Sequence, residues 1–363
     1  MEMDNNFILS NISDYVVESD EIWILSLELD SLVGYNYRNK YLKKIIEFPE
    51  KENCVQRPLF GSIYNFEKKI WLFPIYANDI YVYDIEQNVM NKLGIPFEQI
   101  KGLYKNKHLR IVSDEEKIYC VSKFPSFVVT IDKRNLDYQV DYSEEIEENS
   151  AEWQYNVCFA PCLYNKQIYI PTYKDSILIY NTETRKFHRK QYKIILHTLT
   201  DEAIIDWIVG IQEIAGRLLA YSYDGYIYEI EKESFRLFEG VPAEFLMRKR
   251  NRGRIPAYRN IVGDYNGIYL FPQYSNYILY YDYSKYSIVF KDEWNEKDKI
   301  EYGKEIEWMN GIAVMNNWYN GYFYKFDTVN KQFRKERIKL PRSKIRDLNL
   351  IFQGTYIIDE LGL

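Results

Sequence analysis

Histidine is scarce in this chain, and its placement excludes much of the chemistry that it usually supports. Only His108, His188 and His197 are present, and none lies in a HExxH or HxH pattern or close to a cysteine. A histidine-ligated metal or a histidine-based catalytic triad is therefore not expected. The GxSxG, P-loop and GxGxxG motifs are absent as well. The sequence accordingly predicts no cofactor and no metal site.

Cysteine is also infrequent, with Cys54, Cys120, Cys158 and Cys162 as the full set. If Cys158 and Cys162 share one strand, a rise of about 3.3 Å per residue places them roughly 13 Å apart. That separation is too large for a disulfide or a shared metal ion. We expect these cysteines to be buried structural thiols.

The chain lacks both a targeting segment and a long apolar run. Its first 21 residues are acidic, without a basic start or a sustained apolar core, and no apolar stretch approaches the length that spans a bilayer. The formal net charge of −6 argues against a dedicated nucleic-acid binder. We therefore expect a cytoplasmic protein with neither a membrane nor a nucleic acid as partner.

The chain does contain a repeat, in which an apolar block of two residues recurs at steps of 48, 48, 50, 50, 50 and 44 residues. The blocks are Ile22-Trp23, Ile70-Trp71, Ile118-Tyr119, Ile168-Tyr169, Leu218-Leu219, Ile268-Tyr269 and Ile312-Ala313. A fixed period of this size, built from short β-rich runs, is typical of a β-propeller in which each repeat is one four-stranded blade. The 36 Tyr, 19 Phe and 7 Trp fit this interpretation, because aromatic residues suit pleated sheets.

The sequence thus predicts an all-β fold: a single β-propeller domain over residues 1–363 with seven four-stranded blades. An eight-bladed ring, with one blade split between the termini, is the alternative. The approximate blades are 12–49, 59–96, 108–141, 158–192, 208–240, 258–291 and 303–341, with 346–363 as a ring-closing segment. Apolar residues at 7–11 and 348–359 are left over, and we expect one or both segments to be strands that lock the last blade to the first.

Within a repeat we expect four strands, named a to d. They fall at 59–65, 69–73, 79–84 and 89–95 in the second repeat, and at 259–264, 267–271, 277–282 and 286–291 in the sixth. Strand c ends in Asp or Asn before a polar turn at 81–88, 129–135, 178–186, 280–285 and 324–333. We expect the Asx side chain to accept hydrogen bonds from backbone amides of that turn.

These units resemble the kelch-type propeller family, on the strength of KKIWLFPIYANDIYVYDIEQN and GIYLFPQYSNYILYYDYSK. Kelch repeats carry a Gly-Gly pair after strand b, whereas this chain has Phe73-Pro74, Ile170-Pro171 and Phe271-Pro272 there. This departure makes the chain either a divergent relative of the family or a convergent propeller. The resemblance implies protein or glycan binding, with enzymes in the minority.

A candidate ligand site follows from the loops between strands b and c, which emerge on the same face as the linkers from strand d to the next strand a. Repeats two, four and six carry Pro-x-Tyr there, and repeats five and seven place similar side chains nearby. Aromatic faces among amide and carboxylate groups suit stacking on peptide or sugar surfaces. The candidate residues are Tyr76, Asn78, Tyr173, Asp175, Tyr223, Tyr274, Asn276, Trp318 and Tyr319. Pro-x-Tyr as a packing device copied with the repeat is the alternative.

Two further interpretations concern charge. One linker is strongly basic and forms either a solvated loop or a contact for an anionic partner; its basic residues are Arg248, Lys249, Arg250, Arg252 and Arg254. The acidic stretch 141–152 is likewise either a solvated loop or a docking surface.

The sequence predicts a non-catalytic binding module for a protein, peptide or glycan. The alternative is a carbohydrate-active propeller enzyme, a hydrolase or lyase, whose candidates are Asp175, Asp224, Tyr173 and Tyr223.

Overall fold

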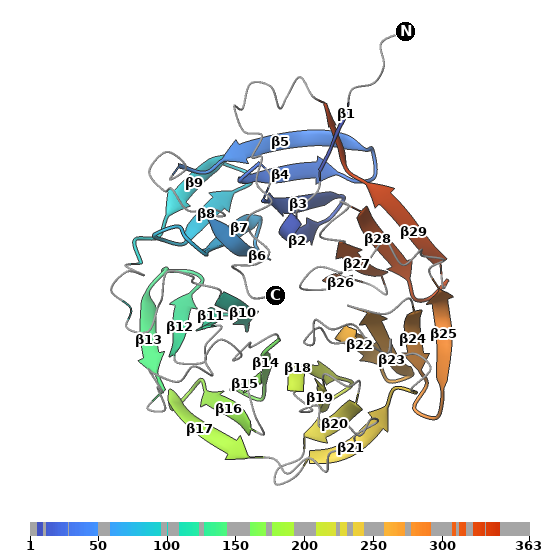
Figure 1. Cartoon of the computed structure of the whole chain (residues 1–363). Helices are drawn as coiled ribbons and strands as arrows, with labels where there is room; N and C mark the ends of the chain where they lie inside the picture. Colours follow the sequence, from blue (N-terminus) through green and yellow to red (C-terminus); the bar gives the residue numbers. More distant parts are fainter. Residues whose placement is uncertain are drawn as a thin grey trace, which may run out of the picture. The chain divides into compact units, whose positions relative to one another are not determined.

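Each predicted repeat forms one antiparallel sheet of four strands, in which strands consecutive in sequence lie side by side (Figure 1). The seven sheets make the chain an all-β, seven-bladed β-propeller, as the repeat predicts, and not the eight-bladed alternative. This computed structural model describes residues 6–9, 12–27, 29–49, 59–95, 100, 109–122, 127–143, 160–171, 176–191, 208–222, 226–230, 235–242, 258–272, 277–291, 307–309, 312–316, 322–330 and 332–341.

The strands agree with the sequence-based bounds to within about two residues in most places. The first three blades are β2 (Ile12–Glu18), β3 (Glu21–Ser26), β4 (Ser31–Asn36) and β5 (Tyr41–Glu47); β6 (Phe60–Phe66), β7 (Lys69–Pro74), β8 (Tyr81–Asp84) and β9 (Val89–Lys92); and β10 (Leu109–Ser113), β11 (Lys117–Ser122), β12 (Phe127–Asp132) and β13 (Tyr138–Tyr142). Blades four and five are β14 (Cys162–Tyr164), β15 (Gln167–Pro171), β16 (Ser176–Asn181) and β17 (Lys186–Gln191); and β18 (Ile208–Ile214), β19 (Arg217–Ser222), β20 (Tyr226–Ile230) and β21 (Phe235–Gly240). Blades six and seven are β22 (Tyr258–Asp264), β23 (Gly267–Pro272), β24 (Tyr277–Tyr281) and β25 (Tyr286–Lys291); and β26 (Glu307–Met309), β27 (Ile312–Asn316), β28 (Tyr322–Asp327) and β29 (Gln332–Arg337).

The chain divides into two compact units. The first comprises Met1–Leu109 with Glu301–Leu363 and holds blades one, two and seven, while the second, Arg110–Ile300, holds nearly all of blades three to six. No helix in the described part of the chain is long and apolar enough to cross a membrane.

The turn from strand c to strand d is built around the predicted Asx residue. Asp84 Oδ1 accepts hydrogen bonds from the amides of Glu86 and Gln87 at 2.9 and 2.8 Å. The same pair of bonds recurs at the other four predicted positions, Asp132, Asn181, Asp282 and Asp327. Since each bond satisfies a backbone donor inside a tight reversal, the recurrent Asx residue fixes the hairpin. This prediction is confirmed in all five places.

The hydrophobic core lies between neighbouring blades. In the first unit, Trp23 and Leu25 of blade one pack with Ile70 and Leu72 of blade two. In the second unit, equivalent side chains of blades five and six form the same kind of cluster, and blades four and five form another. Each blade therefore needs a neighbour to bury its apolar faces, as expected for stacked repeats.

Within the first unit, blades one and seven are joined by a separate two-stranded sheet. β1 (Asn6–Ile8) pairs antiparallel with β30 (Lys339–Pro341), with Phe7 opposite Leu340. Leu9 N donates to Ile338 O at 3.1 Å, and Leu9, Ile338 and Leu340 are buried in the core of these two blades. The N-terminal apolar segment therefore supplies a strand, as predicted, but the other predicted segment, 348–359, lies outside the described residues, as does all of 346–363.

Candidate functional site

Two of the nine candidate ligand residues, Tyr76 and Asn78, lie in the described part of the chain. They belong to the loop that joins β7 to β8 in blade two. The remaining candidates lie outside the described residues: Tyr173, Asp175, Tyr223, Tyr274, Asn276, Trp318 and Tyr319, together with Asp224 and the basic residues Arg248, Lys249, Arg250, Arg252 and Arg254. The described part of the candidate site is therefore the loop of blade two.

This loop has a fixed base. The backbone amides of Ile75, Tyr76 and Ala77 all donate to one acceptor, Leu59 O, at 2.8, 3.1 and 3.0 Å. Ile75 and Ala77 are buried, whereas Tyr76 is half-buried and Asn78 is exposed. The loop therefore anchors Ile75 and Ala77 in the core, while Tyr76 stays partly exposed and Asn78 exposed.

Asp79 closes the loop, and its role was not predicted from the sequence. Its side chain is buried, with Oδ1 accepting from the amides of Ile80 at 2.8 Å and Ile95 at 2.9 Å. Burial raises the pKa of the Asp79 carboxyl, while these bonds and Lys92, whose Nζ lies 3.8 Å away, act in the opposite direction. A raised pKa is typical of catalytic acids. Here Oδ1 of the carboxylate already accepts two backbone hydrogen bonds, and these bonds hold the end of strand d against the loop.

Blade one shows what a carboxylate does at the position of Asn78. Asp30 lies six residues before Asn36, the residue that begins the c-to-d turn, just as Asn78 lies six residues before Asp84. Asp30 is buried, and its Oδ1 accepts from the amide of Leu59 at 3.3 Å. The same repeat position can therefore carry an outward amide or an inward carboxylate. Asp175 occupies this position in repeat four, and like Asp30 it precedes a serine.

Asp141, which the sequence places at the start of an acidic stretch, is neither a solvated nor a docking residue. It lies on β13, buried, and accepts hydrogen bonds from Arg185 Nη2 at 2.6 Å and from Tyr180 Oη at 2.6 Å. Burial acts to raise the pKa of Asp141, but the bonds from Arg185, Tyr180 and Gln139 outweigh it and hold the pKa below its usual range. The sequence interpretation was wrong here because the pairing of Asp141 with blade four depends on tertiary contacts.

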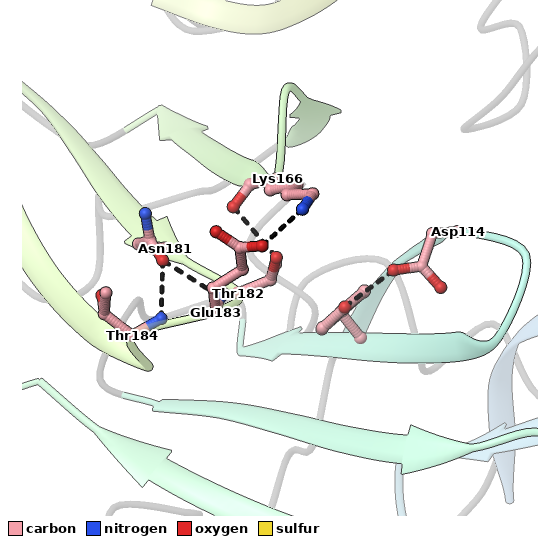
Figure 2. A network of polar contacts seen from close by, with 7 residues as sticks. Asp114, Lys166, Asn181, Thr182, Glu183 and Thr184 are labelled. Atoms are coloured by element: carbon pink, nitrogen blue, oxygen red, sulfur yellow. Dashed lines mark hydrogen bonds and ion pairs between the residues drawn. The ribbon is translucent and has the colours of Figure 1, made fainter.

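A second polar cluster forms at the turns of blades three and four (Figure 2). Asn181 Oδ1 accepts from the amides of Glu183 and Thr184, and Thr182 Oγ1 donates to Lys166 O at 3.0 Å. Lys166 also pairs with Glu183, and Asp114 accepts from Tyr119 Oη at 2.8 Å. These bonds join one turn to the next, so the cluster is explained by the structure of the hairpins.

The described cysteines and acidic residues do not form a metal site. Cys120 and Cys162 are free, buried thiols, as predicted, and burial raises the pKa of Cys162 to about 12. Such thiols are inert at neutral pH. Among the residues that the structure describes, no group of three or more His, Cys, Asp or Glu side chains is placed to hold a metal ion. Cys54 and Cys158 lie outside the described residues.

Comparison with known proteins places the chain by fold alone. No family model matches the sequence, and no curated protein does. Among solved structures, the chain resembles a computationally designed protein, Ika8, with a TM-score of 0.56 at 8% identity over 90% of this chain and 87% of that one. It also resembles the β-propeller domain of Cps50 (Swd1) from Myceliophteria thermophila, with a TM-score of 0.55 at 9% identity over 89% and 99% of the two chains.

A third similar structure is PorZ, a bacterial surface component of the type-IX secretion system of Porphyromonas gingivalis. The TM-score is 0.57 at 9% identity, over 92% of this chain and 39% of PorZ, so the chain spans well under half of that protein. Propellers this diverse share an architecture and not a function. The comparisons support a seven-bladed β-propeller and give no kelch assignment.

Proposed function

We propose that this protein is a non-catalytic binding module that recognises a protein, peptide or glycan through the loops between strands b and c. Propellers commonly serve as binding modules, and the observation that carries the proposal is the loop of blade two. Three amides on Leu59 O and the buried carboxylate of Asp79 fix its backbone, while Tyr76 is partly exposed and Asn78 is exposed. A loop that is ordered before binding loses less conformational entropy when a ligand binds.

The chemistry of these side chains favours ligands with flat apolar faces and polar edges. A tyrosine ring stacks on a peptide group or a sugar ring, and a neighbouring amide both donates and accepts hydrogen bonds. The repeat provides related side chains at Tyr173, Asp175, Tyr223, Tyr274, Asn276, Trp318 and Tyr319, which we propose as further ligand contacts. The kelch-like sequence of the repeats favours the same protein or glycan partners.

We further propose that Arg248, Lys249, Arg250, Arg252 and Arg254 contact an anionic group of the same partner. Guanidinium groups suit this role because they bind carboxylates and phosphates in a bidentate manner. The contribution of such exposed charges depends on ionic strength.

The test begins with the purified chain on peptide and glycan arrays, followed by titration of the strongest hit. Tyr76→Ala should weaken binding by about 1–3 kcal/mol, the usual range for an aromatic at an interface. Its cost to folding should be well below the roughly 3–5 kcal/mol that truncation of a fully buried aromatic costs, because Tyr76 is only partly buried. The same assay tests the basic stretch. Changing Arg248, Arg250, Arg252 and Arg254 to Ser should weaken binding, and raised salt should weaken binding by the wild type.

Tyr265→Ala is the matched control. Tyr265 is 83% exposed in the turn between β22 and β23, which belongs to the other set of turns, so its loss should leave binding unchanged. A large loss of stability in Tyr76→Ala with binding intact would show that Pro-x-Tyr packs the loop and that the ligand site lies elsewhere.

A further inference from the structure

One position of strand c carries a basic residue in blade seven and an uncharged residue in the blades that share its Asx turn. The position lies two residues before the Asx residue, and Lys325 occupies it in β28. The equivalent residues in blades one to four and six are Gly34, Val82, Thr130, Ile179 and Tyr280. The lysine is therefore a feature of blade seven and not of the repeat.

Lys325 lies between blades seven and one, beside an aromatic ring that is fixed in place. Its Nζ atom is 3.4 Å from the centroid of the Tyr37 ring. Tyr37 N donates to Asp20 O at 3.1 Å, and Tyr37 Oη donates to Ser19 O at 2.8 Å, so the turn between β2 and β3 holds both ends of the tyrosine. An ammonium group has three donors, and this cation–π contact leaves donors for a further group.

A second cation lies opposite Lys325 in the sheet. Lys325 and Arg334 face each other in the pairing of β28 with β29, so their side chains leave the sheet on the same face. Like charges at directly opposite positions destabilise a sheet. In blades one to four and six, the equivalent cross-strand pair contains at most one charged residue. Blade seven thus carries a repulsion that those five blades avoid.

The carboxylates around this basic pair have other partners. Asp20 pairs with Arg38 at 3.0 Å, and Glu336 lies 3.9 Å from Lys40. Asp327 accepts hydrogen bonds from two amides of its own turn. Within the described part of the chain, neither cation of the basic pair has a carboxylate oxygen within 4.0 Å of its side-chain nitrogens.

The folded chain therefore holds the ammonium of Lys325 at a cost. Burial is the main cause that lowers the pKa of Lys325. Of the neighbouring charges, two carboxylates act to raise this pKa and two guanidinium groups act to lower it: Glu336 and Asp20, and Arg334 and Arg38. The pKa is lowered overall, so the fold disfavours the charge that this side chain carries in water.

We propose that Lys325 and Arg334 bind a phosphate group between blades seven and one. A phosphate oxygen accepts from the ammonium and from the guanidinium, which replaces a repulsion by two charge-assisted hydrogen bonds. The phosphate dianion balances both cations, whereas a carboxylate balances one. The side chains of Arg38 and Lys40 are 71% and 67% exposed and add positive charge around the site. The proposal is independent of the binding function assigned to the loops between strands b and c.

Equilibrium dialysis of the full chain against radiolabelled inorganic phosphate, at constant ionic strength, tests the site. We expect saturable binding by the wild type, and a loss of affinity of about tenfold or more in Lys325→Met and in Arg334→Gln. Competition by glycerol phosphate would assign an esterified phosphate to the site, and its failure to compete would assign the free ion. Acetate, a monoanion, should displace phosphate far less, and equal displacement by acetate would contradict a phosphate site.

Lys43→Met is the matched control. Lys43 also lies near an aromatic ring, 5.7 Å from the centroid of Trp23, but it pairs with the carboxylate of Glu21. Its loss should therefore leave phosphate binding unchanged.

Thermal unfolding separates a binding role of Lys325 from a structural one. Lys325→Met keeps a side chain of similar length and removes a desolvated charge, so its midpoint without phosphate should stay level or rise. Phosphate at about ten times its Kd should raise the wild-type midpoint by about 2 °C and should not raise that of the variant. A lowered midpoint with phosphate binding intact, equal phosphate binding by the wild type and both variants, or no saturable binding by the wild type would each overturn the proposal.

Discussion

At the scale of single residues, the hairpins depend on positions that adopt a left-handed backbone without glycine. The residue four places after the Asx residue has a positive φ in four blades, and in three of them its amide donates to the Asx carbonyl. These residues are Lys40, Asn88, Leu136 and Arg185. The sequence predicts the Asx bonds, because Asp and Asn recur at fixed positions. It does not predict the left-handed residues, because the side chains at those positions have nothing in common.

The turn between β6 and β7 offers a test of this backbone strain. Glu67 and Lys68 both have positive φ, at 48° and 59°, as in a two-residue type I′ turn, which favours glycine at its second position. Lys68→Gly should therefore raise the thermal midpoint by about 1–2 °C. Loss of the ion pair between Lys68 and Glu86 should matter little, since both side chains are largely exposed.

Lys69→Gly is the control for that change. Lys69 is the first residue of β7 and does not have a positive φ, so glycine there should only weaken the strand. An increase in the midpoint for Lys69→Gly, or a decrease for Lys68→Gly, measured by circular dichroism, would contradict the assignment of strain to this turn.

At the scale of strands and loops, the repeat predicts most of what the structure contains. Strand bounds in the second and sixth repeats follow from the recurring apolar block and the Asx turns, and the loop of blade two leaves Tyr76 partly exposed and Asn78 exposed. The buried carboxylates of Asp79 and Asp141 could not be predicted in the same way. Their partners, Ile95 and Arg185, lie 16 and 44 residues away, and nothing local in the sequence distinguishes an inward carboxylate from an outward one.

The pair of Asp141 and Arg185 predicts a dependence of stability on pH. The folded-state pKa of Asp141 lies below the ordinary value of about 3.9, so its contribution is full above that value and is lost as pH falls through the folded-state pKa. Asp141→Asn should cost about 1–3 kcal/mol at neutral pH. The lower part of that range is expected because Arg185 is about half exposed, so solvent screens the pair.

Chemical denaturation of Asp141→Asn and wild type between neutral pH and pH 3 measures this effect. The difference in unfolding free energy should shrink as the pH falls below about 4. Asp137→Asn, at an exposed residue next to the same strand, is the control and should cost little at neutral pH. A difference that stays constant with pH would show that Asp141 acts through packing and not through its charge.

At the scale of the whole molecule, the last blade is joined to the first by two short strands, β1 and β30, that belong to neither four-stranded sheet. The sequence predicts a strand in the N-terminal apolar segment, because seven repeats leave those residues without a place. It does not predict the partner of this strand, because residues 339–341 continue directly from the last strand of blade seven. The core residues Leu9, Ile338 and Leu340 then connect the pairing of β1 with β30 to the packing of blades one and seven.

Thermal unfolding of chains shortened at the N-terminus tests this account most directly. Removal of residues 1–9 deletes β1 and Leu9 and should lower the midpoint sharply, whereas removal of residues 1–5 leaves the pairing intact and should change little. Leu9→Ala in the full chain should cost about 2–5 kcal/mol, because Leu9 is fully buried. Equal midpoints for the two shortened chains, together with a negligible effect of Leu9→Ala, would contradict the claim that β1 and β30 lock the propeller.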